Sequence, residues 1–318
     1  HVPSIFITFS DSIVTIPVFQ KWIEGLYDIV RFNKVDLIHV CDYEYLTSII
    51  PILIKRKYGN IPAVIVNDAL IGVDYFFNCL PIDFLSKTYT YSLGLNVLKS
   101  YDKIIFLYSE LAERSKRMGI PEGKIRVIPN GIDVEGISDI QKKFNAKSIR
   151  EKYGITEDEK VILYVGRLVK VKRVEILIGV IKKLLKKGLK VKGLIVGDGP
   201  QRTKLEEIAR DINNYIIFTG YVSSLEKFEC YHIADLFMLP SLSEGLPTVL
   251  LEAASFGIPI VATNTNGIPN IIIHGKTGFL VNKWYYCRYA SFAQFILTNS
   301  DMARKIGENA KKHVQNNF

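Results

Sequence analysis

Short apolar, β-branched runs alternate along the chain with longer stretches whose apolar residues recur at helical spacing. This alternation is typical of parallel sheets covered by helices, so we predict an α/β fold. In the first half of the chain the predicted strands are residues 36–40, 63–66, 103–108 and 126–128. In the second half they are residues 161–165, 191–196, 216–219, 236–239, 259–262 and 278–281.

A turn-rich and then basic stretch at residues 130–153 separates the two sets of strands. We place the domain boundary there, so that residues 1–145 and 146–318 each form a doubly wound, Rossmann-like domain. No repeat or flexible linker lies between them, and we expect the two domains to face each other across a cleft. Ligands of such sheets bind beyond the carboxyl ends of the strands, which makes the residues after each strand the candidates for chemistry.

The amino-acid composition is sufficient for two hydrophobic cores, one in each predicted domain. The chain has 318 residues, 48% of them apolar and 23% charged, which excludes disorder as its main state. The cysteines lie far apart and include no CxxC pair, which argues against a structural zinc site or a disulfide framework and for a reducing, cytoplasmic location. No apolar run reaches the roughly 20 residues of a membrane-spanning helix.

The net charge of +9 is uneven, because residues 1–150 carry 18 basic and 16 acidic side chains whereas residues 151–318 carry 23 and 16. Ten basic residues and one acid lie between Arg167 and Lys192. Three interpretations stay open: a solvated helix face, which the lysine spacing favours; a peripheral surface for anionic lipid; or a site for a phosphorylated ligand. Nucleic acid is the weakest candidate partner, because no known nucleic-acid-binding motif accompanies the charge.

Two predicted strands in the second half are followed by residues that suit a phosphate ligand. Residues 161–165 lead into Gly166, Arg167 and Leu168, with Lys172 close behind, and these cations could clamp a diphosphate. Residues 197–200 read Gly-Asp-Gly-Pro and let the backbone approach a ligand, although a tight turn explains them equally well. They do not form a dinucleotide fingerprint, because Arg202 stands at the third glycine position.

The richest stretch runs from residue 240 to residue 257. A strand ends near its start, a loop carries Glu244 and Gly245, and Pro247 suits the first turn of a helix that Gly257 would end. Glu252 would lie about one turn inside that helix. The free N–H groups at the helix start form an anion site, and the two flanking carboxylates suit the hydroxyl groups of a sugar.

Together with the sequence Val-Ile-Pro-Asn-Gly-Ile-Asp at residues 127–133, these motifs resemble the retaining, nucleotide-sugar-dependent family 4 glycosyltransferases of GT-B fold. The resemblance covers nearly the whole chain. It implies two facing Rossmann-like domains, with the acceptor on the side of residues 1–145 and the donor on residues 146–318. It also implies an enzyme that transfers a hexose-type sugar from a UDP- or GDP-linked donor to a glycan, lipid or other acceptor with retention of configuration.

The resemblance implies roles for individual residues. Arg167 and Lys172 would hold the donor diphosphate, and Glu244 would contact the donor sugar near its reacting centre; these three form the expected catalytic set. The expected donor-binding set is Arg167, Lys172, Gly199, Val222, Glu244, Gly245, Leu246, Pro247 and Glu252. The fixed cations and helix-end amides can stabilise the leaving diphosphate, so we expect neither a metal ion nor a cofactor.

The chain departs from the family pattern in three places. Asn67 and Asp68 stand where the family usually has a histidine, and we favour a turn-forming pair over an active-site role for Asp68. Residues 266 and 270 are asparagines where glycine and glutamate are usual, in a loop that could simply turn. Nothing before Val35 matches the family's opening strand and glycine-rich loop, and a returning C-terminal helix is missing, so we expect a fragment whose first domain is truncated.

Two alternative functions remain, a nucleotide-sugar epimerase of the same fold and a non-catalytic nucleotide-sugar-binding fragment. His39 invites a catalytic interpretation, but a histidine inside an apolar strand is more often a packed core residue. Tyr89 and Tyr91 are candidates for an acceptor groove, with core packing as the default.

Overall fold

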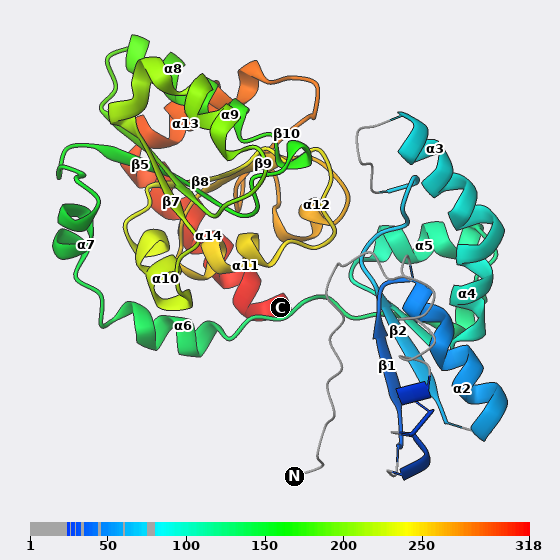
Figure 1. Cartoon of the computed structure of the whole chain (residues 1–318). Helices are drawn as coiled ribbons and strands as arrows, with labels where there is room; N and C mark the ends of the chain where they lie inside the picture. The colour runs from blue at the N-terminus through cyan, green and yellow to red at the C-terminus, as the bar shows by residue number, and fades with distance from the viewer. Residues whose placement is uncertain are drawn as a thin grey trace.

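The computed structural model describes residues 24–25, 27–28, 30–32, 35–43, 46–59, 61–74 and 80–318. Their strands form two separate sheets, one in each half of the chain (Figure 1). The first sheet has the order β1-β2-β3-β4 and the second the order β10-β9-β8-β5-β6-β7, and neighbouring strands are parallel in both. The predicted α/β fold with two Rossmann-like domains is confirmed.

All ten predicted strands are present, with ends that lie within two residues of the predicted ones. The strands are β1 (Ile38–Cys41), β2 (Ala63–Asn67), β3 (Lys103–Phe106), β4 (Ile125–Val127), β5 (Lys160–Val165), β6 (Val191–Val196), β7 (Ile216–Gly220), β8 (Leu236–Leu239), β9 (Ile260–Thr263) and β10 (Phe279–Val281).

Helices connect the strands. In the first domain they are η1 (Leu46–Ile49), α2 (Ile50–Tyr58), α3 (Leu80–Tyr89), η2 (Thr90–Gly94), α4 (Leu95–Ser100), α5 (Ser109–Arg117) and η3 (Glu122–Lys124). Two helices, α6 (Val134–Gln141) and α7 (Ala146–Lys152), follow β4. In the second domain they are η4 (Lys170–Lys172), α8 (Glu175–Lys186), α9 (Arg202–Ile208), η5 (Arg210–Tyr215), α10 (Ser224–His232), α11 (Thr248–Ser255), α12 (Ile268–Ile271), α13 (Cys287–Thr298) and α14 (Ser300–Asn317).

Burial on both faces explains why the strands of the second sheet could be predicted from the sequence. Val161 to Val165 in β5 and all four residues of β8 are buried, because helices cover both faces of a parallel sheet and leave no polar alternation. Above the sheet in Figure 1, α8 turns an apolar stripe inward, with Leu177, Ile181 and Leu184 buried at helical spacing. Each such side chain contributes about 1.5 to 3 kcal/mol by its burial.

The chain crosses between the sheets after β4. The predicted division at residue 145 falls between α6 and α7, and α6 packs against α10 and α11. At the other end of the described chain, α14 brings Phe318 back to this crossing: a Cβ atom on Gly131 would lie 3.2 Å from the Phe318 carbonyl oxygen (Figure 1). The prediction about the opening strand concerns residues before Val35, most of which lie outside the described residues.

One prediction about the first sheet is wrong. His39 is exposed rather than packed in the core, because β1 lies at the edge of the described sheet and alternates between half-buried and exposed residues. The apolar neighbours in the sequence therefore do not enclose its imidazole.

Candidate active site

The turns that follow β5 and β6 are bonded to each other. The Gly166 N–H donates to the Val196 carbonyl at 3.0 Å, and the Leu168 N–H donates to the Asp198 carbonyl at 2.8 Å. A Cβ atom on Gly197 would lie 2.1 Å from the Gly166 oxygen, and one on Gly199 would lie 2.6 Å from the Leu168 oxygen. No larger residue fits at either position without moving the backbone, so Gly199 has a packing role beside its predicted role at the donor.

Lys172 and Glu244, both predicted site residues, are in direct contact. The Lys172 Nζ atom lies 2.7 Å from Glu244 Oε1 and 2.8 Å from Oε2. The Glu244 side chain is only 8% exposed and that of Lys172 is 24% exposed, so the pair is largely shielded from water. Ion pairs with such shielding retain more of their Coulomb energy than exposed pairs.

Arg167, the other predicted cation, is placed differently. Its side chain is exposed, and within the described chain its guanidinium makes no hydrogen bond or ion pair. Its backbone is fixed instead, because the buried Tyr164 hydroxyl donates to the Arg167 carbonyl at 3.0 Å. Of the two predicted cations after β5, Lys172 is therefore held and Arg167 is unengaged.

The loop after β8 leads into a helix without a side-chain cap. Pro247 is the N-cap residue of α11, and no side chain among the described residues accepts a hydrogen bond from the first N–H groups of this helix. Gly257, with φ of 73°, follows the C-cap residue as predicted. The start of α11 thus offers backbone donors and the positive end of the helix dipole next to Glu244, Gly245 and Leu246.

Glu252, one turn inside α11, is held by two residues that the sequence analysis did not select. Lys227 Nζ donates to Oε1 at 2.7 Å, and the Tyr231 hydroxyl donates to Oε2 at 2.9 Å. Both partners come from α10. They fix the carboxylate while leaving further lone pairs for a ligand hydroxyl.

Val222, the predicted contact for the nucleotide base, lies two residues beyond β7. β7 is at the edge of the second sheet, two strands away from β5. Val222 is half-buried. Its predicted role stays a prediction.

Residues of the first domain contact the loop that follows β8. A Cβ atom on Gly245 would lie 3.0 Å from Asp68 Cβ and 3.1 Å from Asp68 Oδ2, so the end of β2 packs against the loop after β8. The Asn130 side chain donates to the Leu246 carbonyl at 2.8 Å. The predicted donor residues Gly245 and Leu246 therefore lie in contact with Asp68 and Asn130 from the first half of the chain.

The loop at residue 266 does more than turn. Asn266 adopts a left-handed conformation with φ of 45°, which asparagine tolerates, and its Nδ2 atom donates to the Asp74 carbonyl at 2.9 Å. The Ser243 hydroxyl donates to the same carbonyl at 2.9 Å. On this point the expectation of a simple turn was incomplete, because the asparagine also joins the two domains.

Asn67 and Asp68 have different surroundings. Asn67 is buried and donates to the Ala69 carbonyl at 2.9 Å, as a turn-forming residue would. Burial raises the pKa of Asp68; the charge of Glu244 adds to this effect and that of Lys172 opposes it. Burial, followed by the charge of Asp68, raises the pKa of Asp42 to about 6.

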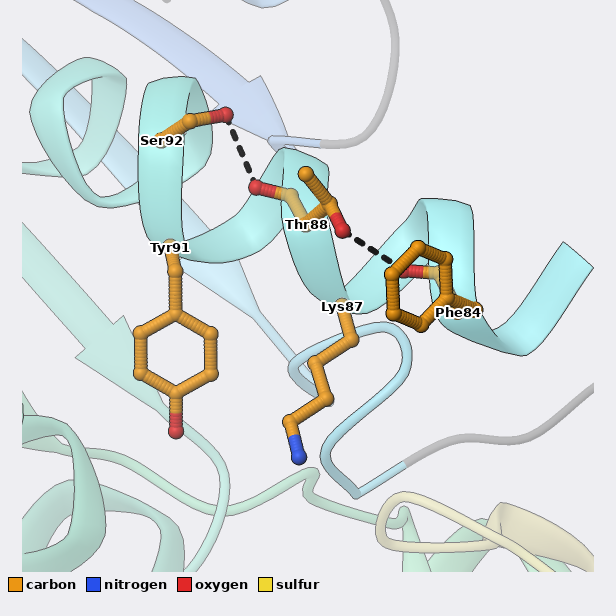
Figure 2. A pocket seen from close by; sticks show the side chains of 5 residues that line it. All are labelled: Phe84, Lys87, Thr88, Tyr91 and Ser92. Carbon is orange, nitrogen blue, oxygen red and sulfur yellow. Dashed lines mark hydrogen bonds between the residues drawn. The ribbon is translucent and has the colours of Figure 1, made fainter.

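A shallow pocket on α3 and η2 contains one of the two candidate tyrosines. Figure 2 shows Tyr91 and Lys87 projecting side by side from the helix, and Phe84, Thr88 and Ser92 complete the lining. Tyr89 instead stacks on Tyr43, with ring centroids 6.1 Å apart. None of the predicted donor-binding residues lines this pocket.

None of the helices in the described part of the chain is long and apolar enough to cross a membrane. Nowhere in this part of the chain do three histidine, cysteine or acidic side chains gather in a way that could hold a metal ion.

Comparison with known proteins agrees with the motifs. The family model described as "Glycosyl transferases group 1" matches residues 145–313, and the model described as "Glycosyltransferase Family 4" matches residues 4–135. The chain therefore belongs to the family 4 glycosyltransferases, which confirms the resemblance noted in the sequence.

Among curated relatives, the chain is 28% identical over 223 residues to N-acetyl-alpha-D-glucosaminyl L-malate synthase of Bacillus anthracis, covering 70% of this chain and 57% of that protein. It is 28% identical over 311 residues to 2-deoxystreptamine N-acetyl-D-glucosaminyltransferase of Niallia circulans, covering 94% of this chain and 77% of that protein. The chain thus spans little more than half the length of the first of these relatives.

Solved structures share the fold. HepE from Anabaena, crystallised with UDP and glucose, superposes with a TM-score of 0.77 at 18% identity, covering 95% of this chain and 77% of that one. Sucrose-phosphate synthase from Thermosynechococcus elongatus gives a TM-score of 0.78 at 21% identity, covering 95% and 74%. These similarities identify the architecture as GT-B.

Proposed function

We propose that this protein transfers a sugar from a UDP- or GDP-linked donor to an acceptor hydroxyl with retention of anomeric configuration. The observation that carries the proposal is the shielded Lys172–Glu244 pair beside the uncapped start of α11. A lysine, an unengaged arginine and free backbone N–H groups after adjacent strands suit a diphosphate. Two oriented carboxylates, Glu244 and Glu252, suit sugar and ribose hydroxyl groups.

In the proposed reaction, the bond between the anomeric carbon and the diphosphate oxygen breaks, and its electron pair leaves with the diphosphate. The acceptor oxygen bonds to the anomeric carbon, and its proton passes to the leaving diphosphate. Arg167, Lys172 and the N–H groups of α11 stabilise the charge that develops on the leaving group. Glu244 orients the donor sugar, and Gly199, Gly245, Leu246 and Pro247 line it with backbone.

UDP is the first nucleotide to test, because HepE was crystallised with UDP. The two curated relatives carry N-acetylglucosaminyl in their names, which makes UDP-N-acetylglucosamine the first sugar donor to try. The proposed reaction uses no metal ion or cofactor, so we propose that it proceeds in the presence of EDTA.

The test begins with thermal unfolding in the presence of a panel of UDP- and GDP-sugars. A donor at about 100 times its Kd should stabilise the fold by about 2.7 kcal/mol. NMR of the product should then show a glycoside with the anomeric configuration of the donor. An epimerised or hydrolysed sugar without glycoside would support the epimerase, and binding without turnover would support the non-catalytic alternative; either result contradicts the proposal.

We also propose that α8 contacts an anionic membrane surface peripherally. Lys183 and Lys186 are exposed on this helix, whereas Lys182 is paired with Asp211. The protein should sediment with phosphatidylglycerol vesicles and not with phosphatidylcholine vesicles, and exchanging Lys183 and Lys186 for glutamine should weaken this. Equal recovery with both vesicle types would end the proposal.

A further inference from the structure

Two acidic residues, Asp42 and Asp68, follow neighbouring strands of the first domain, although the protein as a whole is basic. Asp42 follows β1 and Asp68 follows β2, the neighbouring parallel strand, so the two residues lie at the same edge of the sheet. The Asp42 carboxylate accepts a hydrogen bond from the Asp68 N–H. Asp68 in turn packs against Gly245, next to Glu244.

A second observation at this edge of the sheet points to a ligand. Tyr108 follows β3, the next strand of the sheet, and is only 3% exposed. Its hydroxyl makes no hydrogen bond with any described residue, although buried hydroxyls are normally paired. Burial raises the pKa of Tyr108, and the charges of Asp68 and then Glu110 add to this effect.

Tyr108 also touches the loop that faces Asp68. A Cβ atom on Gly267 would lie 2.9 Å from Tyr108 Cδ1, and the Gly267 N–H donates to the Gly245 carbonyl at 3.1 Å. Asp68 therefore lies against the loop that contains Gly245, Tyr108 lies against the loop that contains Gly267, and a backbone hydrogen bond joins these two loops. The unsatisfied hydroxyl and the carboxylate thus belong to two residues of the first domain that meet the second domain at the same pair of joined loops.

The charges around Asp68 do not balance. Asp68 lies between two other carboxylates in charge interactions, because its charge acts on Asp42 and the charge of Glu244 acts on it, while the charge of Lys172 opposes the effect of Glu244. The proposed donor would engage Lys172 with its diphosphate and bring further negative charge. An acceptor with a positive charge would restore the balance, whereas an anionic acceptor would be repelled.

We propose that Asp68, supported by Asp42 and Tyr108, binds the acceptor and selects one that carries a protonated amine next to the reacting hydroxyl. This inference rests on the proposed function, because it assigns the acceptor to the site proposed for the donor. Asp68 would accept hydrogen bonds from the ammonium group, and the Tyr108 hydroxyl would bond to a neighbouring acceptor oxygen.

Three methyl glycosides of one size provide the test: methyl glucosaminide, methyl glucoside and methyl glucuronide, which are cationic, neutral and anionic at pH 7. Their binding to the full chain is measured by ligand-observed NMR, both in the absence of UDP and in its presence. We expect the cationic probe to bind at least tenfold more tightly than the neutral one, and the anionic probe to bind most weakly. Equal affinities, or preference for the neutral or anionic probe, would overturn the inference.

Asp68→Asn should reduce the ratio of cationic to neutral affinity to near one, and Asp42→Asn should reduce it partly. A general loss of structure would lower both affinities without changing their ratio. Asp139→Asn is the matched control, because this aspartate is exposed on α6, and it should keep the wild-type ratio. A wild-type ratio in Asp68→Asn would contradict the role of this carboxylate.

UDP affinity, measured in parallel by calorimetry, separates the two proposals. If UDP does not bind but the amine preference is present, the proposed function fails on the donor side. If UDP binds and the preference is absent, the acceptor inference alone fails.

Discussion

Replacing Lys172 by methionine removes its charge and keeps much of its length. In the structure its ammonium makes two charge-assisted contacts, at 2.7 and 2.8 Å, with a carboxylate that is 8% exposed. A hydrogen bond to a charged group contributes about 1.5 to 3 kcal/mol. If the lysine holds the donor diphosphate, Lys172→Met should weaken nucleoside diphosphate binding about 10- to 150-fold.

The same substitution also acts on folding, because it leaves Glu244 buried without a cation. We expect a loss of about 1 to 3 kcal/mol of unfolding free energy, the cost of an unsatisfied buried polar group. The double variant Lys172→Met/Glu244→Gln removes the stranded charge, so it should recover most of the stability and none of the nucleotide affinity.

Arg167→Met is the matched comparison. Arg167 is exposed and has no partner among the described residues, so its loss should leave the melting temperature unchanged and still weaken nucleotide binding. Calorimetric titration with UDP and GDP, combined with thermal unfolding of all four proteins, checks these expectations. Wild-type affinity for both nucleotides in both single variants would refute the assignment of the two cations to the diphosphate.

Three further predictions concern stability and the ribose side of the site. The pKa of Asp42 is raised from 3.8 to about 6, so folding takes up a proton between these pH values and the stability of the fold falls as pH rises through them. In denaturant titrations, Asp42→Asn should therefore add up to about 3 kcal/mol to the unfolding free energy at pH 7.5 and nothing at pH 3.5. An equal gain at both pH values would contradict this. Tyr231→Phe removes one hydrogen bond from Glu252, which should weaken UDP binding about two- to tenfold in calorimetry. Unchanged UDP binding would contradict the assignment of Glu252 to the ribose. Gly197→Ala should lower the unfolding free energy by at least about 2 kcal/mol, because the new Cβ atom would clash with the Gly166 carbonyl. Gly179→Ala in α8 should raise the unfolding free energy by up to about 1 kcal/mol, because its Cβ atom would meet open space. The opposite order in thermal unfolding would contradict the packing of the two turns.

Much of the fold could be read from the sequence because local patterns decide it. The strands are apolar runs that helices cover on both faces, and the helix between Pro247 and Gly257 carries its own start and stop signals. His39 shows the limit of this reasoning, because the same apolar pattern also occurs in a strand at the edge of the described sheet, where alternate residues are exposed.

The contacts within the site were less accessible to sequence analysis. Lys172 and Glu244 were each selected, but the direct pair between them depends on how the loops after β5 and β8 meet. Lys227 and its bond to Glu252 have no local signal, because the two residues lie on neighbouring helices. The contact of Asp68 with Gly245 has no local signal either, because it arises only when the two domains pack together.

A crystal structure of the protein with a bound nucleoside diphosphate tests the central claim most directly. We predict that the β-phosphate lies about 3 Å from Lys172 Nζ, from the Arg167 guanidinium and from backbone N–H groups at the start of α11. Phosphates bound elsewhere, with Lys172 still on Glu244 and the helix start unoccupied, would contradict the account.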